Sequence, residues 1–299
     1  MAAQRRAVRC RSVAFVVVAL LAASSAVAQP SLSAEEQELF LKSAKVLRSR
    51  DAGKGVTGTL RVTLSDGTIT HDASVQTVDI SMTEFRSNRG TELNFKDSWR
   101  YNVAAYRLNQ VLQFGLVPVS VERTHNGKPG SFTWWVDDVL MDEGERLKTK
   151  AGAPDVAAWN EQMWHIRLFD QLIQNVDRNL GNLLIDKTWA VWMIDHSRAF
   201  RLSNKLTSPK NLTRIERGAL ERLRAFDAEQ LSEVVGNYLT SFEKRALLQR
   251  RDEIVKLFDE GGPSMIYERP PPVTPIDQAS ASTAWPRSAL DAAMIFCCW

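Results

Sequence analysis

The sequence predicts an α+β protein with two lobes, a small N-terminal lobe rich in β-strands with one helix and a larger helical C-terminal lobe. Short alternating runs of apolar and polar residues, separated by turn signals, fill much of the region before residue 137. Apolar residues at helical spacing dominate after residue 138. One strongly amphipathic helix, expected at 99–112, interrupts the strands. A chain of 299 residues is long enough to give both lobes sizeable cores.

The expected N-terminal lobe covers 29–137 and begins with a helix at 31–50, which Ser33 can cap. Residues 81–97 are polar, and we expect irregular structure there. Strands are expected at 59–64, 73–80, 117–122 and 132–136, with hairpin turns at 65–67 and 126–130.

The expected C-terminal lobe covers 138–260. Its predicted elements are a long helix at 157–174, two short strands at 182–185 and 190–194, and two or three helices within 216–259. Residues 261–299 are rich in Pro and Ser, which predicts a disordered tail.

The first 28 residues have the pattern of a secretory signal peptide. Four arginines precede an apolar stretch at 13–27, and Ala26-Val27-Ala28 matches an A-x-A cleavage site. We therefore expect an exported protein, periplasmic or secreted, that has no membrane segment after cleavage. An uncleaved membrane anchor is the alternative.

The charge argues against a nucleic-acid-binding protein, and the cysteines argue against a fold held together by disulfides. Cleavage would remove four arginines and no acidic residue, so the 38 basic and 35 acidic side chains would become 34 and 35. Nucleic-acid-binding proteins normally carry a strong positive field, so we expect no nucleic-acid partner. Of three cysteines only the adjacent Cys297 and Cys298 would remain, and these cannot staple a fold.

The most informative residues are two carboxylates and an amide at a distinctive spacing. Asp177 follows the predicted long helix, Asn182 lies five residues later, and Asp195 ends the next strand pair. A carboxylate can orient an attacking hydroxyl, while an amide oxygen and a second carboxylate can hold a metal that bridges phosphates. Each residue alone is also common in turns and caps. Taken together, the set predicts a site for a metal-bound nucleotide.

Asp177-Arg178-Asn179 with Asn182, followed by Ile194-Asp195-His196, resembles the DRHxxN … DHG or DFG pattern of atypical kinases. These include phosphatidylinositol 3- and 4-kinases, Hip-type toxin kinases and the secretory-pathway relatives of Golgi casein kinase. The resemblance is specific over about 170–200 and looser over about 53–200. The chain looks like a bacterial, exported member.

The resemblance implies a two-lobed protein-kinase-like fold, with ATP and Mg²⁺ or Mn²⁺ as cofactors and an unknown hydroxyl acceptor, either a protein or a small molecule. It implies that Asp177 is the catalytic aspartate and that Asn182 and Asp195 bind metal. We expect Arg178 to act beside Asp177 by balancing charge in the loop. His196 and Arg198 are expected to contact and position the metal ligands without binding the metal themselves.

The sequence departs from the kinase pattern at several positions. Asn179 stands where His is usual, and Ser197 stands where Gly is usual, which removes a flexible hinge. Kinases pair a strand Lys with a helix Glu, and here Gln76 and Asn102 occupy the corresponding positions. This pair can form a neutral hydrogen bond but supplies no positive charge.

Several other residues are candidates for nucleotide binding. Lys96 is a substitute cation for the phosphates, with Arg100 and Arg178 as further candidates. The stretch 53–58 matches G-x-G-x-x-G, so Gly55 and Gly58 can form a phosphate-covering loop, although a flexible linker explains them equally well.

The backbone of Trp135 and Val136, at the expected crossover between lobes, can hydrogen-bond an adenine. The alternative for Trp135 is simple burial at a strand end.

Three functions remain open at this point. The first is an exported kinase-like phosphotransferase. The second is a pseudokinase that binds or scaffolds a partner, which the missing Lys–Glu pair favours. The third is nucleotidyl transfer on the same fold. Because little ATP is present outside the cytoplasm, an exported member needs another donor or a role without catalysis.

Overall fold

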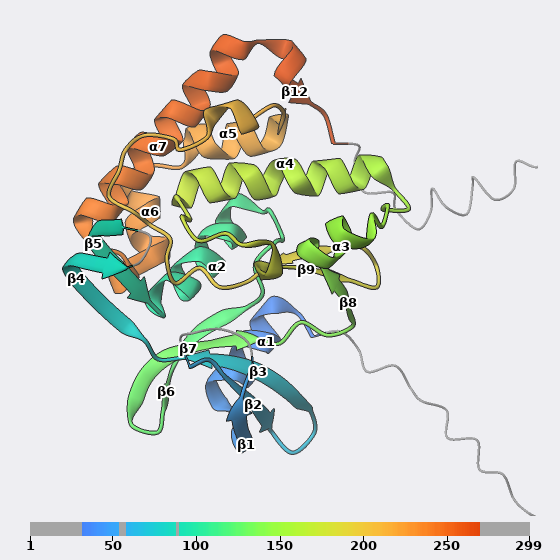
Figure 1. Cartoon of the computed structure of the whole chain (residues 1–299), viewed down its shortest axis with the longest axis vertical. Coiled ribbons are helices and arrows are strands. Elements are labelled where there is room, and N and C mark those ends of the chain that lie inside the picture. Colours follow the sequence, from blue (N-terminus) through green and yellow to red (C-terminus); the bar gives the residue numbers. More distant parts are fainter. Residues whose placement is uncertain (1–31, 54–57, 88–89, 270–299) are drawn as a thin grey trace, which may run out of the picture.

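The computed structural model describes residues 32–53, 58–87 and 90–269, and Figure 1 shows its two lobes. The N-terminal lobe is built on an antiparallel five-stranded sheet with the order β1-β2-β3-β7-β6. Its strands are β1 (Lys45–Asp51), β2 (Leu60–Ser65), β3 (Thr70–Gln76), β6 (Ser120–His125) and β7 (Lys128–Trp134). The strands expected around 59–64, 73–80, 117–122 and 132–136 are confirmed, with ends shifted by a few residues.

The predicted first helix is wrong in its second half. Helix α1 (Ala34–Ser43) begins as expected at Ser33, whose side chain and backbone form a capping box with Glu36. The chain then turns into β1, which pairs with β2 at the edge of the sheet. Arg48 and Arg50, near the end of the expected helix, are exposed on this edge strand, because pairing with β2 outweighs their helix propensity.

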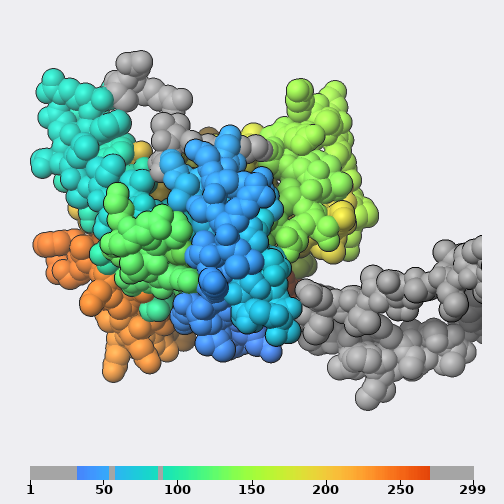
Figure 2. Space-filling view, turned by 90° about the horizontal axis from the view of Figure 1, so that it is seen from below, coloured from blue at the N-terminus to red at the C-terminus, as the bar shows by residue number. Residues whose placement is uncertain are grey.

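The expected irregular segment 81–97 is instead a long β-hairpin. Strands β4 (Asp79–Ser87) and β5 (Gly90–Ser98) pair antiparallel outside the main sheet. Phe85 and Phe95 stack with ring centroids 4.3 Å apart, which supplies the hairpin with a small apolar contact. In Figure 2 the hairpin and the α3–β8 segment rise on opposite sides of the N-terminal sheet.

Helix α2 (Arg100–Leu112) joins the two lobes. It contacts β6 and β7 on one side and α6 (Ala228–Val235) on the other, and most of its residues are buried. The expected helix at 99–112 is therefore confirmed, and its first turn lies beside the loop that follows β10.

The C-terminal lobe is mainly helical, as predicted. Its helices are α3 (Glu143–Thr149), α4 (Val156–Ile173), α5 (Arg217–Ala225), α6 and α7 (Ser241–Gly261), with short 3-10 helices η1 (Leu180–Asn182), η2 (Pro209–Asn211), η3 (Gly236–Tyr238) and η4 (Pro263–Met265). Strands β8 (Val139–Asp142), β9 (Leu183–Asp186) and β10 (Val191–Met193) form a small sheet with the order β10-β9-β8, and β11 (Ile215–Glu216) pairs parallel with β12 (Ile266–Tyr267).

One hydrophobic core runs through both lobes. It includes Val62, Val75 and Phe132 of the sheet, and Phe169 and Leu172 of α4. None of the helices in the described ranges is long and apolar enough to cross a membrane. The expected signal peptide, 1–28, and residues 270–299 of the expected tail lie outside the described residues. The expectation of disorder from residue 261 is wrong at its start, because η4 and β12 follow α7 and β12 pairs with β11.

Candidate functional site

A narrow cleft lies between the two lobes. Its walls come from β3 and β7, from the first turn of α2, from the segment before β6 and from the end of β10. Four residues predicted from the sequence line it together: Gln76, Asn102, Asp195 and His196. Its volume is about 30 Å³, and no Lys or Arg is among the described residues that line it.

The two predicted metal ligands come to the same edge of the small C-terminal sheet. Asn182 immediately precedes β9, and Asp195 follows β10. The two strands are antiparallel, with Met193 opposite Leu183, and the Ile194 N–H donates to the Asn182 carbonyl at 3.0 Å. Hairpin pairing therefore brings together two residues that are thirteen positions apart in the sequence.

Asp195 has an unusual backbone. Its φ is 54°, in the left-handed region that costs a residue other than Gly about 1–2 kcal/mol. The next N–H, that of His196, donates to the Asn102 Oδ1 at 2.8 Å and holds the loop in this conformation. Backbone strain that the surrounding structure imposes is found most often at functional sites.

The loop after α4 carries Asp177 on its exposed side. The Asp177 N–H donates to the Asn175 side chain at 3.1 Å, and its carbonyl accepts from the Asn179 N–H at 2.8 Å. These local bonds fix the turn and leave the carboxylate near the surface. The Asp177 charge helps to raise the pKa of the buried Asp97 carboxyl, so the two carboxylates lie close enough to repel each other.

Arg178 bonds to the scaffold of the C-terminal lobe. Its guanidinium forms an ion pair with Asp170 of α4 at 3.1 Å, and it donates to the carbonyls of Ile194 at 2.7 Å and Asn182 at 3.3 Å. Burial raises the pKa of the Asp170 carboxyl, and the Arg178 charge opposes that rise. These contacts tie the Asp177 loop to both predicted metal ligands and make Arg178 a positioning residue.

The neutral pair expected from the sequence is present. The Asn102 Nδ2 donates to the Gln76 Oε1 at 2.5 Å and to the Ser131 hydroxyl at 3.3 Å. Because the Asn102 Oδ1 also accepts from the His196 N–H, one amide links the sheet, α2 and the loop of Asp195. A kinase would use a charged pair here, whereas this chain uses hydrogen bonds without charge.

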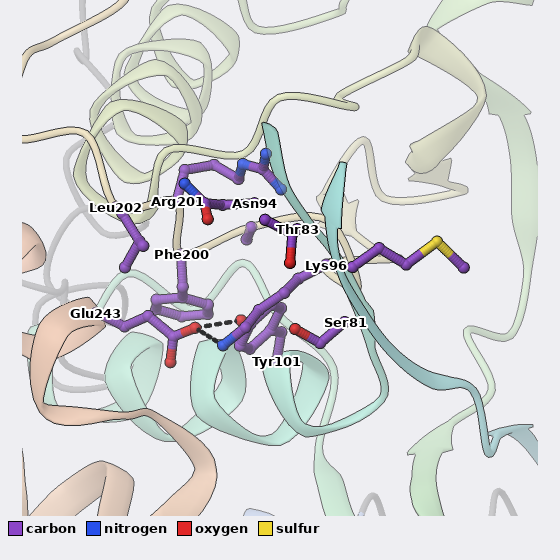
Figure 3. A pocket seen from close by; sticks show the side chains of 11 residues that line it. Ser81, Thr83, Asn94, Lys96, Tyr101, Phe200, Arg201, Leu202 and Glu243 are labelled. Atoms are coloured by element: carbon purple, nitrogen blue, oxygen red, sulfur yellow. Dashed lines mark hydrogen bonds and ion pairs between the residues drawn. The ribbon is translucent and has the colours of Figure 1, made fainter. Parts of the chain in front are cut away.

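Lys96 lies outside the cleft and lines a second cavity of about 150 Å³ (Figure 3). Its ammonium forms an ion pair with Glu243 at the start of α7, and the Tyr101 hydroxyl donates to the same carboxylate. This cavity lies between the hairpin, α2 and the segment 199–202. The structure therefore does not bring Lys96 together with Asp195 in the cleft.

The other predicted nucleotide contacts are dispersed. Gly58 is exposed with φ 65°, and Gly55 lies outside the described residues. Trp135 stacks with Arg61, whose guanidinium carbon is 4.1 Å from the ring centroid, and Val136 follows in the segment between β7 and β8. Neither of these two residues lines the cleft.

His196 lines the cleft next to Asp195, whereas Arg198 contacts the hairpin, and their expected role beside the metal ligands stays a prediction. His196 is buried, and burial, aided by the Arg178 charge, lowers the pKa of its imidazole well below its ordinary value. The ring is therefore neutral. Arg198 forms an ion pair with Glu92 of the hairpin at 2.6 Å, and its guanidinium lies 4.2 Å from the Phe95 ring centroid.

Sequence reasoning missed one acidic residue of the site. Asp97 of β5 is 8% exposed, accepts a hydrogen bond from the Ser197 side chain, and lies within electrostatic range of Asp195 and Asp177. The signal was the alternation of polar and apolar residues over 92–97, which is typical of a strand but is masked by the polar surroundings.

These residues fit a divalent cation. Mg²⁺ and Mn²⁺ prefer carboxylate, amide and water oxygens, and the Asp195 carboxylate and the Asn182 amide supply such oxygens at one edge. The buried Asp97 Oδ1 has no hydrogen-bond partner among the described residues, as expected of a group with a missing ligand. Within the described ranges, no three His, Cys, Asp or Glu side chains already converge on a metal position.

No protein-family model matches the chain, and no curated protein matches its sequence. Solved structures do match its fold. A structure of hydra Fam20 with sugar superposes with a TM-score of 0.55 and 16% identity, covering 78% of this chain and 92% of that one. Golgi casein kinase with Mn and ADP bound gives a TM-score of 0.51 and 13% identity over 80% of each chain, and another structure of that kinase gives 0.52 and 14% over 79% and 80%.

This chain has a two-lobed kinase-like fold. Solved structures with a similar fold include Fam20 and Golgi casein kinase, and the motif around Asp177 and Asp195 resembles the pattern of such kinases. At such low identity the likeness shows the fold and leaves the activity of this chain to the residues of its own cleft.

Proposed function

We propose that this chain is an exported phosphotransferase that uses a metal-bound nucleoside triphosphate to phosphorylate a hydroxyl acceptor, a protein or a small molecule. The observation that carries the proposal is the strained loop of Asp195. This carboxylate lines the interlobe cleft, and its loop is held by the bond from the Ile194 N–H to the Asn182 carbonyl and by the bond from the His196 N–H to Asn102. The likeness to a kinase solved with Mn and ADP supports the same assignment.

Asp177 would orient the acceptor. Its exposed carboxylate can accept the proton of the attacking hydroxyl while the hydroxyl oxygen forms a bond to the γ-phosphorus. The bond from the γ-phosphorus to the bridging oxygen breaks, and the nucleoside diphosphate leaves with that electron pair. Arg178 would hold the loop at the required distance through Asp170 and the carbonyls of Ile194 and Asn182.

Asn182 and Asp195 would hold the metal, which would supply positive charge to the phosphate oxygens. This charge matters here because no Lys or Arg is among the described residues that line the cleft. The cavity of about 30 Å³ is small beside known ligand pockets, so we expect the two lobes to separate when a nucleotide binds. We therefore expect binding of the nucleotide to depend strictly on the metal.

A second candidate function is that of a pseudokinase, in which the cleft binds a nucleotide or a partner without transfer. The neutral Gln76–Asn102 pair supports it, because the phosphates would lack the usual lysine. A third candidate function is nucleotidyl transfer, and the analysis of reaction products described below distinguishes it from phosphoryl transfer.

Isothermal titration of the purified protein with ATP and Mn²⁺ tests the proposal. We expect binding in the presence of Mn²⁺, none with ATP alone, and at least tenfold weaker binding in Asp195→Asn. The matched control is Asp259→Asn, which removes an exposed carboxylate of α7 that is paired with Arg224. This control should bind as the unaltered protein does.

Incubation with radiolabelled ATP and mass spectrometry of the products then distinguish the candidates. Phosphoryl addition to the protein or to an added acceptor, abolished in Asp177→Asn, would support the transferase. Addition of the whole nucleotide would mean nucleotidyl transfer. Binding without any product would leave the pseudokinase, and absence of binding with every metal would refute a nucleotide site.

A further inference from the structure

Asp97 occupies a position that joins the hairpin to the loop of Asp195. It is the second-last residue of β5, opposite Ile80 of β4, and it lies just before α2. The N–H of its neighbour Ser98 donates to the Ser197 carbonyl at 2.9 Å. The end of the hairpin is thus bound directly to the segment that follows Asp195.

The two oxygens of the Asp97 carboxylate have different environments. The side chain accepts a hydrogen bond from Ser197, the residue that replaces the usual glycine. Its Oδ1 is buried and has no partner among the residues that the structure describes. A buried carboxylate oxygen without a partner is costly, and a missing ion or water is a common explanation for such a group.

The charges around Asp97 are mainly negative. Burial raises the pKa of the Asp97 carboxyl most, and the charges of Asp195 and Asp177 raise it further. The Ser197 hydrogen bond and the Arg198 charge oppose this rise, but Arg198 is itself paired with Glu92. Three carboxylates therefore share a region with little positive charge of its own, and a divalent cation would balance them.

We propose that Asp97 is a third ligand of the metal site and that its unpartnered oxygen binds Mg²⁺ or Mn²⁺ together with Asp195 and Asn182. The inference rests on the proposed function, because it requires a cation at Asp195. In the described residues, the carboxylates of Asp97, Asp177 and Asp195 do not converge on one point. The cation would therefore contact some of them through bound water molecules, as Mg²⁺ usually does.

Ser197 has a defined part in this arrangement. A glycine at this position could not donate a side-chain hydrogen bond, so the substitution and the acidic residue act as a pair. Ser197 would orient one oxygen of Asp97 and leave the other for the cation. If Asp97 were purely structural, it would only accept the hydrogen bond from Ser197 and would not bind the cation.

Titration of the full-length protein with Mn²⁺ in the presence of ADP, followed by electron paramagnetic resonance of the free ion, separates these two roles. We expect Asp97→Asn to lower the affinity for Mn²⁺ about tenfold or more. Asp79→Asn is the matched control, because Asp79 belongs to the same hairpin but bonds to Ser98 and Arg100. It should leave the affinity unchanged.

Two further measurements make the test specific. Ser197→Ala keeps the Asp97 carboxylate, so it should retain most of the Mn²⁺ affinity, whereas a structural role predicts that it behaves like Asp97→Asn. Without metal, Asp97→Asn should melt at the same temperature as the unaltered protein or higher, because it removes a crowded buried charge. Its increase in melting temperature on addition of Mn²⁺ and ADP should be smaller.

The outcomes separate this inference from the proposed function. If Asp195→Asn loses Mn²⁺ and Asp97→Asn does not, the role of Asp97 is refuted and the metal site stands. If the unaltered protein binds no Mn²⁺, both proposals fail. If Asp97→Asn loses its fold in metal-free buffer, Asp97 is structural and the inference is overturned.

Discussion

His165 is an ionisable residue enclosed by the C-terminal lobe. Its ring stacks on Phe114 with centroids 5.2 Å apart, and the Tyr267 hydroxyl lies 3.5 Å from Nε2. The Glu216 carboxylate is 3.9 Å away, too far for a hydrogen bond. Burial, followed by the charges of Arg269 and Arg222, lowers the pKa of His165 to about 4. The folded protein therefore holds this ring neutral.

The free energy of unfolding should fall as the pH drops from about 6.5 to 4. In this range the unfolded chain protonates His165 while the folded protein does not, so stability is complete above pH 6.5 and is lost toward pH 4. The loss from this residue is about 3 kcal/mol at 1.36 kcal/mol per pKa unit. Urea unfolding at several pH values measures it, and His165→Gln should flatten the dependence. An unchanged slope in that variant would contradict the prediction.

Arg178 should matter more for stability than its place in a catalytic loop suggests. Arg178→Met leaves the largely enclosed Asp170 carboxylate without its ion-pair partner, which costs up to about 3–5 kcal/mol. Chemical denaturation measures this loss. The double variant Asp170→Asn/Arg178→Met should recover part of it, because no unpaired charge remains. Equal losses in the single and double variants would mean that the bonds from Arg178 to the carbonyls dominate.

At the scale of elements, the hairpin β4–β5 restrains the segment that follows Asp195. Glu92 forms ion pairs with both Arg198 and Arg201. From the other side, the buried Arg250 of α7 donates to the carbonyls of Arg201 and Ser203. The segment is therefore held between the hairpin and α7, and residues 199–202 also line the cavity in Figure 3.

Glu92→Gln should loosen this segment. The variant weakens two ion pairs at once, so we expect cleavage by trypsin after Arg198, Arg201 or Lys205 to become several times faster, while the melting temperature changes little. Glu84→Gln is the control, because Glu84 lies on the same hairpin and its ion-pair partner among the described residues is the exposed Arg86. Equal cleavage rates in the two variants would show that the hairpin does not restrain the segment.

At the scale of the whole molecule, uncharged groups join the sheet, α2 and the loop of Asp195 at the cleft, although ion pairs link the lobes elsewhere. The double variant Gln76→Lys/Asn102→Glu would introduce the charged pair that kinases use. Because the lysine would face the cleft, we expect binding of ADP without metal to appear or to become at least tenfold tighter. Calorimetry measures this, and Asn102→Glu alone, which adds only negative charge, should give no gain.

The sequence predicted the two lobes, helices α2 and α4, the strand pair β9–β10 and the Gln76–Asn102 bond, because each depends on strong local patterns. The hairpin β4–β5 escaped prediction because its few apolar residues, such as Met82, Leu93 and Phe95, are outnumbered by polar ones, so their alternation was overlooked. Strand β1 escaped because pairing with β2, distant in sequence, decides its conformation.

Residues that act through distant partners could not be assigned from sequence. The role of Asp97 depends on Ser197, a hundred positions later, and that of Lys96 depends on Glu243. The partner of Arg178 lies within α4, where the apolar periodicity gives no indication that Asp170 is buried beside a loop. In each case tertiary packing supplies the information that the local pattern lacks.

The neutral bond between Gln76 and Asn102 has a consequence for the surroundings in which the protein works. Dissolved salt screens attractions between charges near a protein surface, but it has little effect on a hydrogen bond between two amides. The position of α2 against the sheet should therefore not change between low and high salt concentration. In the exported protein that we propose, this bond would keep α2 in place at salt concentrations that would weaken a charged pair.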